Sequence, residues 1–202
     1  MAAMGIVRRT AGVWGPVSFA AASVVAARRQ PGYSHVANHV SGLAAAGQPS
    51  AAVMVPGFLA LGAASLLMPV PSPTARRMAR LAGLTTIAAG LVPASQLHCP
   101  RPGTDPDATA LDVGHGVASI TTFVLWIAMP CTAATQPGPR WFRRTSAALG
   151  AAALAGFVAA GVTTRADSPR KGLAQRGLLA PVFAWHLATA AVGPQTTWPQ
   201  PA

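Results

Sequence analysis

Residues 149–162 read LGAAALAGFVAAGV and include no charged or strongly polar side chain. A helix exposed to water keeps one polar face, whereas a helix that is apolar on all sides is surrounded by protein or lipid. This stretch offers no polar face in any helical register. With its neighbours it forms an apolar run over residues 146–163, close to the roughly 20 residues that cross a bilayer. The run predicts a membrane-spanning helix.

Five further apolar runs occur along the chain, and charged or proline-rich connections separate them. They occupy residues 11–27, 50–70, 81–97, 113–134 and 177–192. Only 9% of the 202 residues are charged, against about 25% in a soluble protein. The sequence therefore predicts an all-α fold, a bundle of six transmembrane helices over residues 11–192. The first run also has the basic start and small residues of a signal peptide, but we expect it to be retained as a helix.

Small residues and prolines within the runs suggest how the helices pack. Small side chains let membrane helices approach closely, and neighbouring helices tolerate proline kinks in lipid. We expect close helix contacts at Gly83, Gly90, Gly150, Ala153, Gly156 and Gly161, and kinks within the spans at Pro56, Pro93 and Pro181.

The basic residues give the chain a net charge of +11 and stand in groups at the ends of the runs. Nucleic-acid binding would need them on one solvated face, so their distribution disfavours it. Two central connections, residues 71–80 and 136–144, carry only basic charges, whereas residues 98–112 carry one arginine and three aspartates. The positive-inside rule then predicts a plasma-membrane protein with both termini cytoplasmic, including residues 1–10 and a short tail, residues 193–202.

This orientation brings four histidines to the extracytoplasmic face. His35 and His39 are four residues apart and could reach one metal ion from a short surface helix, with His98 and His115 as further ligands. Imidazoles in this number suit zinc. Interfacial histidines without a ligand are the alternative, because the spacing contains no complete metal motif.

Two further groups of residues suggest chemistry. Asp112 and His115 are three residues apart, so the carboxylate could orient the imidazole as a catalytic acid or base; the alternative is that Asp112 caps a helix. His186 lies roughly 15 Å into the last run, where an ionisable side chain suggests function, although a structural hydrogen bond to a neighbouring helix would also satisfy it. A bis-histidine haem would need a second histidine at that depth, and the sequence has none.

The connection before the last run is densely basic. Arg165, Arg170, Lys171 and Arg176 lie close together with one acid, Asp167. Arginine is suited to bidentate contacts with phosphate, so these residues could bind a lipid headgroup; plain solvation is the alternative. Cys99 and Cys131 are predicted at opposite membrane surfaces, too far apart for a disulfide.

Several short motifs together resemble a known family. They are SGLAAAGQP, with Ser41, Leu43, Gly47 and Pro49; Pro93; His115; and GLAQRG, with Gly172, Leu173 and Arg176. In this order they resemble the bacterial six-span membrane family known as domain of unknown function 998. Ala44 stands where that family often has glycine. The resemblance covers roughly residues 10–192 and implies an integral membrane protein without an assigned activity.

Two functions are consistent with these patterns. The first is the binding or handling of a lipid or other amphiphile at the extracytoplasmic face, with membrane lipids as partners. The second is a membrane-embedded enzyme, with zinc as a candidate cofactor, that acts on a lipid or isoprenoid. The first is favoured because no catalytic motif is complete, and the sequence does not set the oligomeric state.

Overall fold

The structure, a computed structural model, describes residues 2–70, 72–101 and 103–192 and is all-α within them. Six α-helices follow one another: α1 (Ala2–Arg29), α2 (Ala51–Leu67), α3 (Pro73–Leu91), α4 (Ala110–Thr135), α5 (Arg140–Arg165) and α6 (Lys171–Val192). A short 3₁₀ helix, η1 (Val40–Ala44), lies between α1 and α2. The described residues contain no β-strand, so the predicted fold class is confirmed.

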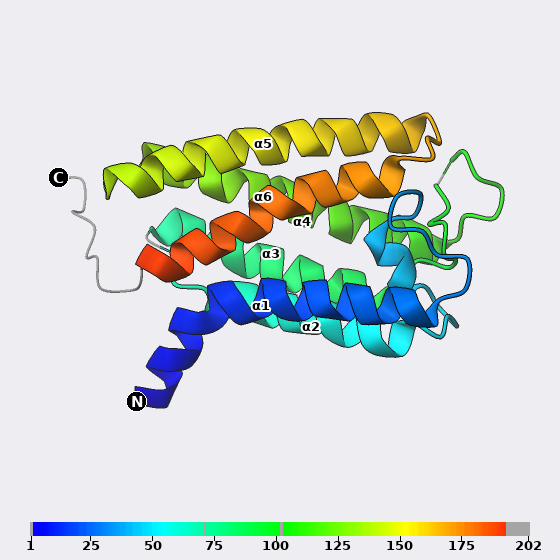
Figure 1. Ribbon diagram of the computed structural model, residues 1–202, viewed down its shortest axis with the longest axis horizontal. Helices are drawn as coiled ribbons and strands as arrows, with labels where there is room; N and C mark the ends of the chain where they lie inside the picture. Colours follow the sequence, from blue (N-terminus) through cyan, green and yellow to red (C-terminus); the bar gives the residue numbers. More distant parts are fainter. Residues whose placement is uncertain (1, 71, 102, 193–202) are drawn as a thin grey trace.

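The helices form a ring in the order of the sequence. Each helix packs mainly against its sequence neighbours, α6 closes the ring against α1, and α4 and α6 barely touch. Because the helices alternate in direction, α1 begins and α6 ends at one end of the bundle (Figure 1). The connections α1–α2, α3–α4 and α5–α6 gather at the other end, which we call the loop end (Figure 1).

Within the part of the chain that the structure describes, three helices are long and apolar enough to cross a membrane. These are α4, α5 and the part of α1 from Thr10 to Arg29, while α2 is apolar but shorter. Large apolar side chains such as Val117, Ile120, Leu154 and Val162 are exposed on the outside of the bundle. Water would not stabilise such a surface, so the protein is a helical membrane protein. The crossing of the membrane by all six helices stays a prediction.

Most helices are longer than the apolar runs that predicted them. Helix α5 includes the basic residues from Arg140 to Arg144 as its first turns, and α1 already begins at Ala2. Helix α3 begins at Pro73 because the Ser72 hydroxyl accepts from the N–H of Ala75 at 3.1 Å. A serine cap followed by proline at the first helical position is a favourable helix start. The predicted tail, residues 193–202, lies outside the described residues.

Glycines make the close helix contacts that the sequence predicted. A Cβ on Gly156 would lie 2.7 Å from the backbone of Leu178, and a Cβ on Gly83 would lie 2.7 Å from the carbonyl oxygen of Gly62. Gly90 and Gly150 likewise face a neighbouring helix, and Ala153 is fully buried. The prediction for Gly161 is wrong, because a Cβ at this position would meet no described atom within 4 Å.

Two of the three predicted intrahelical prolines lie inside helices. Pro56 is in α2 and Pro181 is in α6. Pro93 is not in a helix: α3 ends at Leu91 with Val92 as its C-cap. A residue before proline is pushed out of the helical conformation, so the proline ends α3 earlier than the apolar run suggested. His98, predicted at the end of this span, therefore lies in the α3–α4 connection.

Candidate functional site

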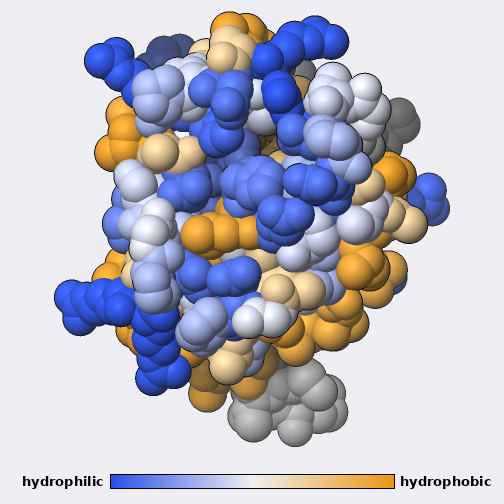
Figure 2. Space-filling model, turned by 90° about the vertical axis from the view of Figure 1, so that its right-hand side faces the viewer, coloured by the Kyte–Doolittle hydropathy of each residue, from blue (hydrophilic) through white to orange (hydrophobic). Residues whose placement is uncertain are grey.

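The loop end collects most of the polar residues that the sequence pattern singled out. Hydrophilic side chains cover much of this end, and apolar side chains flank them (Figure 2). His35 and His39 come from the α1–α2 connection, His98 from the α3–α4 connection, and Asp167 from the α5–α6 connection. The opposite end carries the arginines at the starts of α3 and α5. The residues predicted to share one face therefore do share one end of the bundle.

A pocket of about 260 Å³ lies at the loop end, and we call it the loop pocket. Segments from all three connections line it, together with the end of α5 and the start of α6. Its lining residues are His39, His98, Cys99, Arg101, Asp105, Thr164, Asp167 and Lys171. Two of the predicted metal ligands and one predicted headgroup residue thus meet in one pocket, together with side chains that were not predicted to form a site.

Two ion pairs bring the charges of the loop pocket close to balance. The Lys171 ammonium donates to Asp167 Oδ1 at 2.6 Å, and Arg101 Nε lies 3.8 Å from Asp105 Oδ2. Arg101 also donates from Nη1 to the carbonyl oxygens of Thr164 and Arg165, at 3.1 and 3.0 Å. Arg101 therefore ties the α3–α4 connection to the end of α5 and holds two walls of the pocket together.

His39 is half-buried at the edge of the pocket, and one of its two ring nitrogens has a hydrogen-bond partner. Its Nε2 lies 3.2 Å from the hydroxyl of Thr164, whereas Nδ1 has no hydrogen-bond partner among the described residues. Burial, and secondarily the charge of Lys171, lowers the pKa of His39 to about 4. The imidazole is therefore neutral at neutral pH.

Cys99 and Asp167 line the pocket with left-handed backbone conformations, at φ values of 54° and 48°. They are the non-glycine residues with positive φ in the part of the chain that the structure describes. Aspartate tolerates this conformation better than cysteine does, and such strain concentrates at functional sites. Burial raises the pKa of the Cys99 thiol to about 11, so it stays protonated and is a weak metal ligand or nucleophile at neutral pH.

Arg176, predicted to bind a headgroup, instead holds the α1–α2 connection. Its Nη1 donates to the carbonyl oxygens of His35, Asn38 and Gly172 at 2.7, 3.2 and 3.0 Å. Its Nη2 contacts Tyr33 Oη and His35 Nδ1. Arg165 and Arg170 are exposed outside the pocket lining. Of the four predicted headgroup residues, the structure brings only Lys171 into the loop pocket.

Asp112 has a structural role close to the capping alternative: Thr109 is the N-cap residue of α4, and Asp112, three residues later, completes a capping box with it. Its Oδ2 accepts from the backbone N–H and the hydroxyl of Thr109, both at 2.8 Å. Ser95 donates to it from its backbone N–H at 2.8 Å and from its hydroxyl at 2.7 Å. The carboxylate therefore fastens the end of α3 to the start of α4, and no hydrogen bond joins it to His115.

His115 is buried between α3 and α4. Its Nδ1 lies 3.0 Å from the carbonyl oxygens of both Ala89 and Val92 at the end of α3, and its Nε2 lies 3.3 Å from the hydroxyl of Ser119. Both ring nitrogens thus have protein partners. This arrangement joins two helices and leaves neither nitrogen open to a metal ion or a substrate.

The four histidines proposed as metal ligands are not brought together. His35 contacts Arg176, His115 is enclosed between helices, and only His39 and His98 share the loop pocket. Within the described residues, no three His, Cys, Asp or Glu side chains are grouped as a metal ion would require. The geometry does not support the zinc site.

The expected surface helix around His35 and His39 is replaced by turns and the buried η1 helix. The backbone N–H of Val40 donates to Gln175 Oε1 of α6 at 2.7 Å. Gly172 of α6 lies so close to the backbone of Asn38 that it has no room for a Cβ. These contacts hold η1 inside the ring, where Val40 and Leu43 are buried, whereas Val36 is exposed.

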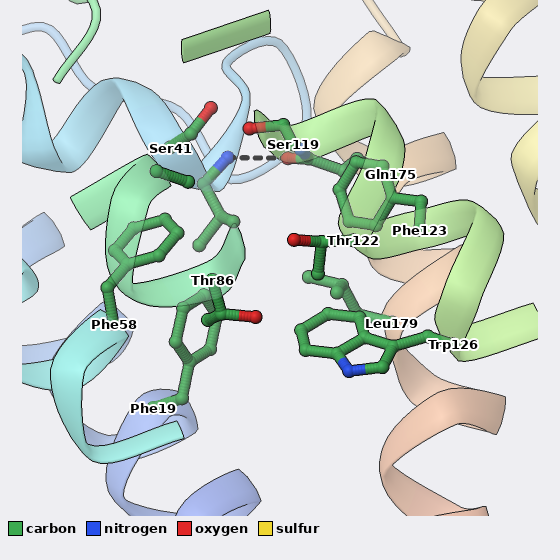
Figure 3. A pocket seen from close by; sticks show the side chains of 12 residues that line it. Phe19, Ser41, Phe58, Thr86, Ser119, Thr122, Phe123, Trp126, Gln175 and Leu179 are labelled. Carbon is green, nitrogen blue, oxygen red and sulfur yellow. Dashed lines mark hydrogen bonds between the residues drawn. The ribbon is translucent and has the colours of Figure 1, made fainter. Parts of the chain in front are cut away.

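Below η1, the ring encloses a small cavity of about 20 Å³, enough for one water molecule. Phe19 and Phe58 face Trp126 and Leu179 across it (Figure 3). Sequence reasoning missed this cavity, although polar residues inside apolar runs, such as Thr86 and Thr122, could have indicated an interior surface. The buried ring nitrogens Trp126 Nε1 and His186 Nε2 have no partner among the described residues.

His186 satisfies its other nitrogen within its own helix, since Nδ1 lies 2.9 Å from the carbonyl oxygen of Val182. Its ring stands edge-to-face against Trp126, with centroids 5.9 Å apart. The hydrogen bond to a neighbouring helix that would have satisfied this side chain is not made by the described residues.

Comparison with protein-family models shows to which family the chain belongs. The model of the family described as a protein of unknown function, DUF998, matches residues 13–192. The chain belongs to the DUF998 family. One of the motifs that suggested this relationship lies where the DUF998 ring is closed, since Gly172 and Arg176 of α6 contact the α1–α2 connection. No curated protein and no solved structure matches the chain.

Proposed function

We propose that this DUF998 protein binds a lipid or another amphiphile through the loop pocket, at the extracytoplasmic face of the plasma membrane. The observation that carries the proposal is a charged pocket of about 260 Å³ at one end of a bundle with an apolar exterior. An amphiphile needs both environments at once, a polar site for its headgroup and an apolar surface for its chain.

The lining chemistry supports a headgroup ligand. Lys171 and Arg101 supply cationic donors, Thr164 supplies a hydroxyl, and His39 keeps one buried nitrogen without a partner among the described residues. The volume is below the range of about 300–1,000 Å³ for pockets that enclose a drug-sized molecule. A headgroup fits such a space, and the rest of the molecule would lie along the helices in the bilayer.

The orientation rests on the distribution of charge. The loop end carries all four aspartates and seven of the basic residues. The opposite end carries eight basic residues and no acid, and six of the eight stand at the starts of α3 and α5: Arg76, Arg77, Arg80, Arg140, Arg143 and Arg144. Basic residues favour the cytoplasmic side, so the loop pocket is assigned to the extracytoplasmic side. The alternative of a membrane-embedded enzyme has weaker support, because Asp112 and His115 are both occupied by structural hydrogen bonds.

The test is mass spectrometry of lipids that copurify with the protein in a mild detergent. We expect wild type to retain a lipid in near-stoichiometric amount and Lys171→Met to lose most of it. Arg170→Met is the matched control, because Arg170 is exposed next to Lys171 but outside the pocket lining. Equal lipid content in all three proteins would count against the proposal.

A further inference from the structure

The loop pocket contains an unusual share of the negative charge of this basic chain. The protein has four acidic residues against 15 basic ones, and two of the four, Asp105 and Asp167, line this pocket. A pocket that binds only an anion gains nothing from carboxylates, which repel the ligand. Their presence beside Arg101 and Lys171 indicates a ligand with charges of both signs.

We infer that the loop pocket binds a zwitterionic headgroup that carries a phosphate and a primary ammonium group. This inference rests on the proposed function and names its ligand class. The charged side chains of the pocket are two cations, Arg101 and Lys171, and two carboxylates, Asp105 and Asp167, beside the imidazoles of His39 and His98. A ligand with one charge of each sign matches this balance. A singly charged anion would offer the two carboxylates no positive group to pair with.

The hydrogen bonds within the pocket leave both donors on the cations and acceptors on the carboxylates free to contact a ligand. An ammonium has three donors, and Lys171 uses one of them on Asp167 Oδ1. Asp167 Oδ2 and Asp105 Oδ1 accept no hydrogen bond from the described residues, since Asp105 uses Oδ2 for the backbone N–H of Arg101. The remaining donors of Lys171 can therefore contact a phosphate while the free carboxylate oxygens accept from an ammonium.

The type of ammonium group follows from the lining residues. Quaternary ammonium groups are recognised by cages of aromatic rings. No Phe, Tyr or Trp is among the described residues that line the loop pocket. Carboxylate oxygens instead accept hydrogen bonds, which a primary ammonium donates and a trimethylated one cannot. The pocket therefore favours phosphoethanolamine over phosphocholine.

The experiment measures binding of three lipids to the detergent-purified full chain by native mass spectrometry: phosphatidylethanolamine, phosphatidylcholine and phosphatidylglycerol. Free phosphoethanolamine is added in a parallel arm, to separate a membrane lipid from a soluble headgroup. We expect wild type to prefer phosphatidylethanolamine by about tenfold over the other two, the size of one charge-assisted hydrogen bond.

The decisive variants are Asp105→Asn and Asp167→Asn, which keep the side-chain shape and remove one negative charge each. Asn also accepts the left-handed conformation found at position 167, so folding is preserved there even if the change at position 105 disturbs the connection. We expect each variant to lose the preference for phosphatidylethanolamine over phosphatidylglycerol. Asp107→Asn is the matched control, because Asp107 is exposed and outside the pocket lining, and it should keep the preference.

The outcomes separate the inference from the function on which it rests. One outcome is that phosphatidylglycerol binds as strongly as phosphatidylethanolamine and loses its binding in Lys171→Met. This result would overturn the inference of a zwitterionic headgroup and leave the proposal of amphiphile binding intact. Equal binding of phosphatidylcholine would overturn the assignment of a primary ammonium. Binding of free phosphoethanolamine as tight as that of the lipid would support the charge assignment and overturn the lipid as its source. Lipid binding that no pocket variant changes would overturn both proposals.

Discussion

Arg176 Nη1 donates to the carbonyl oxygen of His35 at 2.7 Å, joining the last helix to the first connection across 141 residues of sequence. The same guanidinium reaches Asn38 and Tyr33, so one side chain of α6 holds the α1–α2 connection in place. His39, which follows Asn38 directly, lines the loop pocket. The position of one pocket wall therefore depends on this residue.

Replacement of Arg176 by lysine tests this dependence. An ammonium keeps the charge but lacks the planar fork that reaches several acceptors at once, so Arg176→Lys should destabilise the protein by about 2 kcal/mol. Thermal unfolding in detergent measures the loss. Arg170→Lys, at an exposed position, should leave the melting temperature unchanged. An unchanged melting temperature in Arg176→Lys would show that the charge alone is sufficient at this position.

Two glycines of α6 provide a matched pair for the packing of the α1–α2 connection. A Cβ on Gly172 would strike the backbone of Asn38, whereas nothing lies within 4 Å of a Cβ on Gly177. We expect Gly172→Ala to lower the melting temperature. Gly177→Ala should be neutral or stabilise by up to about 1 kcal/mol, because alanine favours the helix. If both changes stabilise α6, the close approach to Asn38 is not present in the protein.

Asp112 should prove structural. Asp112→Ala removes four hydrogen bonds that fasten Ser95 and Thr109, and we expect a loss of about 2–3 kcal/mol in unfolding free energy. Unfolding measurements on Asp107→Ala, at an exposed neighbouring position, should give the wild-type value. An Asp112→Ala protein with wild-type stability would make this residue a candidate catalytic group again.

Acid should weaken the fold through His39. Its pKa is about 4 in the folded protein and about 6.5 in the unfolded chain. Between these values the unfolded chain binds more protons, so stability falls as the pH falls through this window. The loss is at most about 3 kcal/mol. Melting temperatures from pH 7 to pH 4 should decline less steeply in His39→Gln than in wild type, and equal slopes would assign the decline to other groups.

Cysteine labelling tests the orientation. In a Cys99→Ser, Cys131→Ser background, Thr104→Cys places a thiol on the exposed α3–α4 connection, and Thr74→Cys places one at the exposed start of α3. In intact cells, a membrane-impermeant maleimide should react with the first variant only. Permeabilised cells should react in both cases. Labelling of Thr74→Cys alone in intact cells would reverse the assignment of the two faces.

The sequence predicted the helices well because their signal is local. An apolar run of about 20 residues carries its own information on length and environment, as residues 113–134 and α4 illustrate. Because successive helices run in opposite directions, every second connection lies at the same end of the bundle. His39, His98 and Asp167 were therefore assigned to one face without knowledge of any contact. Helix ends were less predictable, because helices such as α5 continue through basic residues that terminate the apolar run.

The candidate site was predicted only in part, because its contacts join distant segments. Nothing near Arg176 in the sequence indicates that its side chain donates a hydrogen bond to His35. Nor does the sequence show that Lys171, five residues earlier, lines the loop pocket while Arg176 does not. The spacing of Val36, Val40 and Leu43 suggested a surface helix, yet Gln175 holds Val40 in the interior. Arg101 was not predicted as a site residue, since its partners Thr164 and Arg165 lie more than 60 residues away.

The ring in sequence order has a consequence for biogenesis. Helices α1 to α5 can each pack on their predecessor as they leave the ribosome, since neighbours in the chain are neighbours in space. The α1–α2 connection, however, depends on Gln175 and Arg176, which belong to α6 and are synthesised after the other described helices. We expect a nascent chain truncated before α6 to insert in the membrane with this connection open to protease, and the full-length chain to protect it. Completion of the final helix would then be the step that matures the ligand site.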